Sequence, residues 1–182
     1  MIGKISEGEL GLMAKKLNPL QKQLEQQKFL HALDYVRRES NGIKKLTTSE
    51  LSRINQFITG NDEEPWRFNS VHIELPNGQI QEMNVITNPI NRARDILSSS
   101  FDLAANDQIQ LAAIELYTHL VLEHLFLSGN RRTAVLAVAW LLSCHNLNID
   151  AEVLLKVPVG NLRNETEKES FKEALLRLIS QS

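Results

Sequence analysis

Two long apolar segments, separated by a short polar loop, constrain the fold of this 182-residue chain most strongly. Apolar residues occupy nearly every face of a helix from Ile109 to Phe126, and again from Arg131 to about His145. A helix that is apolar all round is buried in the middle of a domain. The sequence therefore predicts two central helices joined by a tight turn at Leu127-Ser128-Gly129.

Shorter segments with helical patterns surround the central pair, and capping residues mark their ends. Asn18-Pro19 and Asn88-Pro89 each place a capping residue before a proline in the first turn of a helix. Thr47-Thr48-Ser49-Glu50 has the spacing of a capping box. Asn41-Gly42 and Gly60 are typical helix ends. We predict outer helices over 19–39, 47–60, 88–98, 150–155 and 166–179, and we predict that Asp107 starts the first central helix.

One segment has the alternation of a β-hairpin. Val71, Ile73 and Leu75 alternate with polar residues, Asn77-Gly78 follows, and a second run extends from Ile80 to Ile86. Asn-Gly between two such runs is a strong hairpin signal. The predicted fold is therefore mainly α, with one hairpin on the flank of a helical domain.

Composition excludes several classes of protein. The net charge is −2, from 20 basic and 22 acidic side chains, so we expect neither a nucleic-acid coat nor a membrane-surface binder. Cys144 is the single cysteine, which rules out an internal disulfide or a multi-cysteine metal site. The apolar stretch Thr133–Cys144 is too short to span a bilayer, and residues 1–20 hold no apolar core of signal-peptide length. We expect a protein of the reducing cytosol.

The turn between the two central helices carries the residues of greatest chemical interest. Arg131 and Arg132 fall in the first turn of the second central helix, where the free N–H groups already make the helix end electropositive. A bound anion would remove this conflict, since helix N-termini and arginines both bind phosphate. Gly129 would let a ligand approach the backbone, and Asn130 would cap the helix and fix the loop. His124 stands beside this site with a pKa suited to proton transfer.

A simpler interpretation of the same residues remains open. His124 can be a helix-end histidine that binds a backbone carbonyl. Arg131 and Arg132 can be paired with nearby acids. Taken alone, these residue types do not decide between the two interpretations.

The run His124-Leu-Phe126-Leu-Ser-Gly129-Asn130-Arg-Arg132 resembles the Fic/Doc signature, His-x-Phe-x-Asp/Glu-Gly/Ala-Asn-x-Arg. It meets five of the six fixed positions. The similarity extends over roughly residues 50–180, with Trp66-Arg67 before the hairpin in the expected order. The resemblance implies a Fic-type helical bundle around two central helices with a hairpin flap. It also implies an N-terminal helical extension at 1–45 and a catalytic domain at 46–182.

The same resemblance implies a role for each residue of the motif. His124 would be the general base that deprotonates a target hydroxyl, and Phe126 would anchor the loop. The phosphates of a bound nucleotide would be held by Ser128, Gly129, Asn130, Arg131 and Arg132. The donor would be ATP, and the activity would be transfer of AMP to a hydroxyl side chain of a target protein. That target would dock on the 71–86 hairpin by strand addition.

Two departures from the signature leave other activities open. Ser128 replaces the acidic residue that holds magnesium, and a lone hydroxyl is a poor ligand for that ion. We therefore assign no metal ligand, and any Mg²⁺ would rest on the phosphates and water. Val135 stands where AMP-transferring members carry a second arginine, as in the Doc branch, which resembles a protein kinase and toxin. A catalytically weak relative that acts by binding is the third reading.

The resemblance also sets expectations about partners and place. No exact copy of the family's inhibitory motif occurs, so control by a separate inhibitor or antitoxin protein is expected over self-inhibition. The first helix, rich in glutamine and lysine, would serve as a docking element or as a contact between copies of the chain. No nucleic acid or membrane partner is expected. The protein would act in the bacterial cytoplasm or after delivery into another cell.

Overall fold

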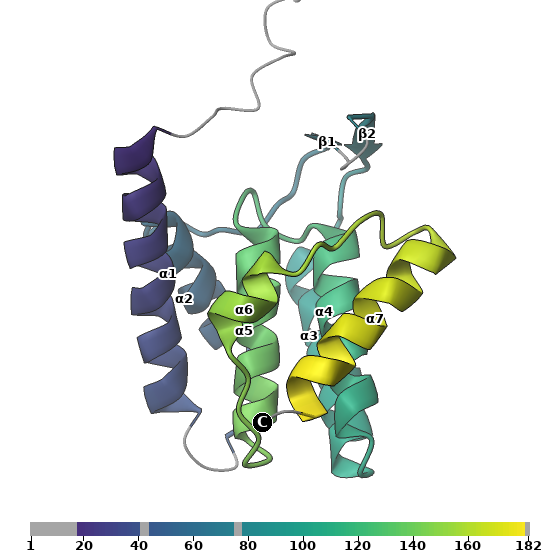
Figure 1. The fold of residues 1–182 in the computed structure, drawn as a ribbon. Coiled ribbons are helices and arrows are strands. Elements are labelled where there is room, and N and C mark those ends of the chain that lie inside the picture. Colours follow the sequence, from purple (N-terminus) through teal and green to yellow (C-terminus); the bar gives the residue numbers. More distant parts are fainter. Residues whose placement is uncertain (1–17, 41–43, 75–77, 181–182) are drawn as a thin grey trace, which may run out of the picture.

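The computed structural model describes residues 18–40, 44–74 and 78–180 and confirms a mainly helical fold with one two-stranded hairpin. Figure 1 shows the helices side by side, with the hairpin standing beyond one end of the bundle. The elements in chain order are α1 (Pro19–Glu39), α2 (Thr48–Thr59), β1 (Val71–Glu74), β2 (Ile80–Met83), α3 (Pro89–Ala105), α4 (Ile109–Glu123), α5 (Asn130–Ser143), α6 (Ala151–Lys156) and α7 (Glu165–Ser180).

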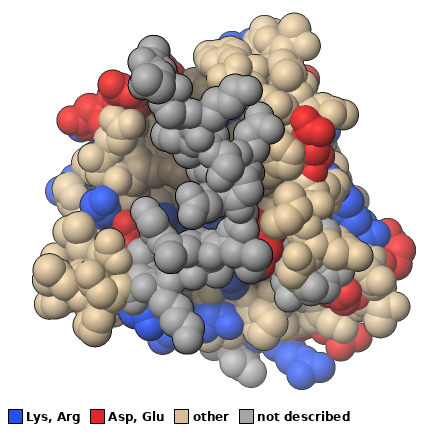
Figure 2. Space-filling view, turned by 90° about the horizontal axis from the view of Figure 1, so that it is seen from above, with Lys and Arg blue, Asp and Glu red and all other residues tan. Residues whose placement is uncertain are grey.

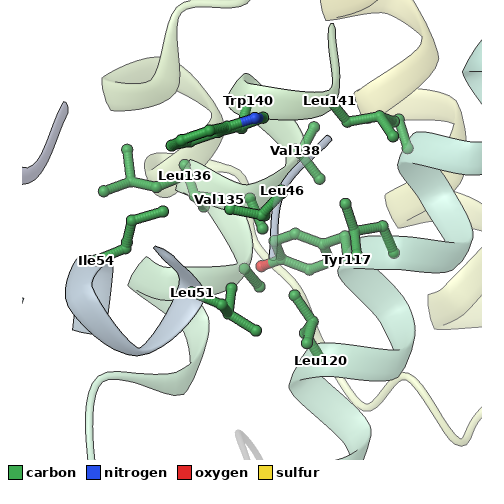
Figure 3. Packing of buried hydrophobic residues seen from close by; sticks show 14 of the residues in the cluster. Leu46, Leu51, Ile54, Tyr117, Leu120, Val135, Leu136, Val138, Trp140 and Leu141 are labelled. Carbon is green, nitrogen blue, oxygen red and sulfur yellow. The ribbon is translucent and has the colours of Figure 1, made fainter. Parts of the chain in front are cut away.

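The two apolar helices occupy the centre, as predicted. α4 packs against α3, α5 and α7, and α5 also contacts α1, α2 and α6. Figure 3 shows the core where α2, α4 and α5 meet, with Ile54, Tyr117 and Trp140 among the side chains that fill it. These three residues are fully buried or nearly so. The central pair is therefore a rigid base for the loop that joins α4 to α5.

Local capping explains where α1 and α2 begin. The Asn18 side chain accepts a hydrogen bond from the Gln21 backbone, and Thr47 and Glu50 form the predicted capping box. Gly60 ends α2 in the left-handed conformation, with φ 69°. The predicted stop of α1 at Asn41-Gly42 falls outside the described residues. α1 buries Phe29, Ala32, Leu33 and Val36 in the same core as the other helices, while a domain boundary at residue 45 stays a prediction.

Three predicted element ends were wrong. α3 continues to Ala105 and does not stop at Ser98, because Phe101 and Ala104 are buried in the core and hold another two turns in place. α4 begins at Ile109 after the N-cap Gln108, and it ends at Glu123, not at Phe126. It ends there because the backbone beyond the helix pairs with residues 65–67.

The hairpin is antiparallel, with Val71 opposite Met83 and Ile73 opposite Gln81. Its second strand ends at Met83 and not at the predicted Ile86. Beyond Met83, the Asn84 carbonyl accepts a hydrogen bond from the Arg67 guanidinium at 2.9 Å, so the backbone there bonds to this side chain and not to β1. No helix in the described part of the chain is long and apolar enough to cross a membrane.

Candidate functional site

The candidate site lies where the α4–α5 loop, the hairpin and the segment between α6 and α7 gather at one end of the bundle (Figure 1). Figure 2 looks onto this end. On the described part of that face, Lys and Arg side chains are interspersed with Asp and Glu side chains, without a continuous field of one sign.

His124 is the C-terminal cap of α4 and has a left-handed backbone, with φ 49° and ψ 55°. Its Nδ1–H donates a hydrogen bond to the Val121 carbonyl at 2.8 Å. That bond fixes the tautomer, because Nδ1 must carry the proton and Nε2 must carry the lone pair. The ring is half-buried and lines two neighbouring cavities. His124 therefore lines both cavities, and the lone pair of its ring is on Nε2.

The surroundings of His124 keep its ring neutral. Burial is the main cause that lowers the pKa of His124 below the usual 6.5. The positive charges of Arg67 and Arg163 lower the pKa further, while the hydrogen bond to the Val121 carbonyl opposes the shift. A neutral imidazole at neutral pH is the form that can accept a proton.

Two asparagines hold the loop. The Asn130 Oδ1 accepts a hydrogen bond from the Phe126 backbone N–H at 2.9 Å, and its Nδ2 donates to the Phe126 carbonyl at 2.9 Å. Asn55 on α2 donates from Nδ2 to the Ser128 carbonyl at 2.9 Å and to Thr133 Oγ1 at 2.9 Å. The prediction that Asn130 caps α5 was wrong. The N-cap is Gly129, and the Asn130 side chain ties the loop to itself instead.

Gly129 is required by the loop's shape and by α2. Its φ is 74°, a conformation that glycine adopts without strain. A Cβ here would lie 3.1 Å from Ile58 Cγ2 and 3.2 Å from Asn55 Nδ2. This crowded side faces α2, so packing accounts for the glycine without a ligand.

Phe126 lies beneath the loop. It is 2% exposed and stacks on Trp66, with ring centroids 4.7 Å apart. The backbones of these residues also pair: the Arg67 N–H donates to the Leu125 carbonyl at 2.8 Å, and the Leu127 N–H donates to the Pro65 carbonyl at 3.0 Å. These hydrogen bonds therefore attach the start of the loop to the segment that precedes the hairpin.

Both arginines of the motif have partners within the protein. Arg131 donates from one terminal nitrogen to the carbonyls of Leu155 and Val157, each at 2.6 Å. Arg132 forms an ion pair with Glu25 on α1. The His124–Val121 bond and the Arg132–Glu25 pair are contacts of the simpler interpretation, whereas Arg131 bonds to backbone carbonyls and not to an acid. These contacts leave the N-terminus of α5 open, since no described side chain caps its first N–H groups.

Two cavities meet at His124. One, of about 500 Å³, is lined by the loop residues 127–132, by Val71, His72 and Ile73 of β1, and by Leu155. The other, of about 250 Å³, is mainly apolar and lies between the hairpin, the end of α4 and residues 159–163. His124 and Arg131 line both. The structure thus brings His124 and residues 128–132 together around one opening, with Phe126 buried below.

The residues of the larger cavity do not form a magnesium site. Ser128 is exposed, and among the described residues no Asp or Glu side chain lines this cavity. Within the described ranges, no group of three or more His, Cys, Asp or Glu side chains could hold a metal ion. Hydroxyl and amide groups alone are weak ligands for a hard divalent cation.

Sequence reasoning assigned no site role to three residues that shape the site. Asn55 lies in the buried stripe between Leu51 and Ile58, and a polar residue on an apolar stripe is a signal that could have been read. Arg67 is fully buried between two aromatic neighbours in the sequence. Glu25 carries no local signal, because its partner lies 107 residues away.

This architecture, two buried helices whose connecting loop lies beside a flanking hairpin, defines a class with solved members. A Fic-domain-containing signalling protein from Bacteroides thetaiotaomicron VPI-5482 matches at a TM-score of 0.58 and 18% identity, over 94% of this chain and 74% of that protein. A Fic family protein from Desulfovibrio desulfuricans G20 matches at 0.54 and 14%, over 91% of this chain and 48% of that one, so this chain spans about half its length. No protein-family model and no curated protein matches the sequence. The chain has the Fic fold.

Proposed function

We propose that this protein transfers the AMP group of ATP to a hydroxyl side chain of a target protein. The observation that carries the proposal is the position of His124. Its Nδ1 is occupied by the Val121 carbonyl, so Nε2 is the available base. The ring lies between two cavities and beside the open N-terminus of α5. The Fic fold supports the same activity, because members of this family commonly transfer AMP.

The proposed reaction needs one rearrangement, the opening of the Arg132–Glu25 ion pair. Nε2 of His124 takes the proton of the target hydroxyl, and the hydroxyl oxygen attacks the α-phosphorus of ATP. The bond to the bridging oxygen breaks, pyrophosphate leaves, and AMP remains on the target. The first N–H groups of α5 bind the phosphates, as open helix N-termini do, and Arg132 adds charge once Glu25 releases it.

The two cavities suit the two parts of the donor. The cavity of about 500 Å³ beside the loop binds the phosphates and receives the target hydroxyl. The smaller one is lined by Ile73, Val121 and Leu162 and binds the base, since flat apolar rings bury well against such side chains. Binding pockets usually join an apolar wall to a few polar groups in this way.

The hairpin is the proposed docking site for the target. Apolar side chains remain exposed at and beside it, with Phe68 at 51%, Ile80 at 64% and Val85 at 61%. An extended segment of the target would add to the edge of β1 by backbone hydrogen bonds. β1 contributes residues to the larger cavity, so a docked segment would pass close to His124.

One observation favours a second activity, phosphoryl transfer from ATP to a protein. Val135 stands one turn after Arg132 and is fully buried, so it contributes nothing to the site. A second arginine at this place is what the AMP-transferring pattern would carry. A protein that binds nucleotide or partner without turnover is the remaining alternative, and Ser128 in place of an acid favours it.

The three candidates differ in the product. The full chain is incubated with ATP and candidate target proteins, and each target is weighed by mass spectrometry. A gain of AMP supports the proposal, a gain of phosphate supports the kinase alternative, and no change supports binding alone. His124→Ala should abolish the gain, whereas His119→Ala, which removes a half-exposed histidine paired with Glu115, should not.

A further inference from the structure

In the part of the chain that the structure describes, Arg67 is the one charged side chain that is fully buried. It is 1% exposed, and no carboxylate among the described residues pairs with it. Burying a guanidinium is unfavourable unless its N–H groups find acceptors. Burial lowers the pKa of Arg67 from its usual value. The side chain must therefore be held by other contacts.

Backbone carbonyls supply those contacts. The Nε–H donates to the His124 carbonyl at 2.6 Å, and one terminal nitrogen donates to the Glu123 carbonyl at 3.3 Å. The other terminal nitrogen donates to the carbonyls of Asn69 at 2.6 Å, Asn84 at 2.9 Å and Met83 at 3.5 Å. One guanidinium thus joins the end of α4 to both legs of the hairpin.

The contacts at α4 supply hydrogen-bond donors to the carbonyls at the C-terminus of that helix. The last carbonyls of a helix lack partners and carry the negative end of its dipole, which a cation stabilises. His124 also has a left-handed backbone, which is costly for a residue with a side chain. The bond from Arg67 to the His124 carbonyl fixes the orientation of that peptide. The direction of the imidazole ring then follows from the backbone and from the Val121 contact.

The contacts at the hairpin have a different consequence. Asn69 precedes β1, while Met83 and Asn84 lie at the end of β2. A two-stranded hairpin is marginally stable by itself and needs an anchor. The same guanidinium also bonds to the His124 carbonyl. A displacement of the hairpin would therefore disturb the hydrogen bond that orients the His124 peptide.

We propose that Arg67 is a positioning residue that holds His124 and the hairpin as one unit, so that a target docked on the hairpin is aligned with Nε2. This inference rests on the proposed function for its chemistry, but the coupling itself is structural. Arginine is required for it, because its planar fork offers five N–H donors, while lysine offers three from one point.

The first measurement needs no variant. In the wild-type protein, hydrogen exchange of the Arg67 Nε–H is followed by NMR and compared with that of Arg94, an exposed arginine on α3. The Arg67 proton should exchange at least tenfold more slowly, since it is buried and bonded. Equal exchange rates would overturn the proposal, whether or not any variant folds.

The second measurement compares Arg67→Lys with the matched control Arg94→Lys. In Arg67→Lys, the ¹⁵N signals of the His124 ring should shift from the single Nδ1–H tautomer to a mixture, and the amides of β1 and β2 should exchange about tenfold faster. The amides of α4 and α5 should be unchanged in both variants. If Arg67→Lys keeps the wild-type tautomer and the wild-type hairpin exchange, Arg67 does not couple the two.

The transfer assay separates this inference from the proposed function. Arg67→Lys should lower kcat by about 10- to 100-fold while KM for ATP changes less than twofold, because a misplaced base affects chemistry more than donor binding. Arg94→Lys should match wild type. If the NMR changes occur and kcat does not fall, the positioning role is wrong. If the wild-type protein transfers nothing to any target, the proposed function fails, and the NMR comparison alone decides the coupling.

Discussion

Replacing His124 by glycine should have opposite effects on stability and on chemistry. The left-handed backbone at φ 49° costs an L-residue about 1–2 kcal/mol, and glycine is free of that cost. Removing the side chain also removes the bond from Nδ1 to the Val121 carbonyl, a loss of about 0.5–1.5 kcal/mol. The bonds that Arg67 makes at this point go to backbone carbonyls, so both survive the change.

In His124→Gly, the relief of backbone strain nearly offsets the lost hydrogen bond, whereas in His124→Ala the strain remains and nothing offsets the loss. The free energy of unfolding of His124→Gly should lie within about 1 kcal/mol of the wild-type value. His124→Ala loses the same hydrogen bond and keeps the backbone strain, so it should be about 1 kcal/mol less stable than His124→Gly. For a chain of this length, that difference is about 2–4 °C in Tm. Both variants should lose the transfer reaction by about 10²–10⁴-fold, the usual contribution of a positioned base.

Thermal and urea unfolding followed by circular dichroism measures the stability order, and mass spectrometry of the target measures transfer. Nucleotide affinity, measured by calorimetry, should be nearly unchanged in both variants. If His124→Gly is less stable than His124→Ala, the left-handed backbone does not cost an L-residue the expected free energy, and the reasoning fails. If either variant keeps wild-type transfer, His124 is not the base.

Four further outcomes follow from the same geometry. Phe126→Ala, which removes a buried ring stacked on its neighbour, should cost about 3–5 kcal/mol in urea unfolding; a loss below 1 kcal/mol would show that it is no anchor. Glu25→Gln should raise ATP affinity about two- to fivefold in calorimetry, because it frees Arg132 from a partly exposed ion pair, and no gain would mean that Arg132 does not meet the nucleotide. Ser128→Asp should make nucleotide affinity depend on Mg²⁺, whereas strong dependence already in wild type would show that the metal is held some other way. Because burial and the two nearby guanidinium groups lower the pKa of His124, transfer should rise with pH through a midpoint below 6.5 and stay flat above it; a midpoint above 6.5 would contradict this.

The same pKa shift has a consequence for stability. A histidine whose pKa is lower in the folded state than in the unfolded chain favours folding when it is neutral. Its contribution is fully present above pH 6.5, the ordinary value, and is lost as the pH falls through the lowered pKa of the folded state. The His124 variants should therefore lose less stability than wild type as the pH falls below 6.5.

Local chemistry made much of the fold predictable. The capping box at Thr47, the Asn18-Pro19 start and the stop at Gly60 depend on residues within a few positions of one another. The end of α3 depends on distant contacts instead. The run Ser98-Ser99-Ser100 looks like a helix end, but the burial of Phe101 in the core carries the helix through it. Sequence patterns report local preference, and packing can override it.

The candidate site likewise combines residues that the sequence predicted with residues that it did not. The motif residues are contiguous, so their gathering around one loop was predictable from the chain. The residues that hold the loop come from elsewhere: Asn55 lies 73 positions before Ser128, and Arg67 lies 57 before His124. No spacing rule links such pairs, because the fold alone brings them together. The error about Asn130 arose because its side chain had a nearer partner, the backbone of Phe126, than the helix end that it was expected to cap.

The partners of the two arginines differ in kind, and this difference bears on how an anion would bind. Arg131 is held by two neutral carbonyls of the α6 end, so its place is fixed by the fold. Arg132 is held by the carboxylate of Glu25, which is itself an anion and is one-third exposed. A phosphate can replace a carboxylate as the partner of a guanidinium, and the partly exposed pair costs little to break. Under the proposed function, Arg132 is therefore the arginine that exchanges its partner for the phosphate, and the carboxylate with which the phosphate competes belongs to the same chain.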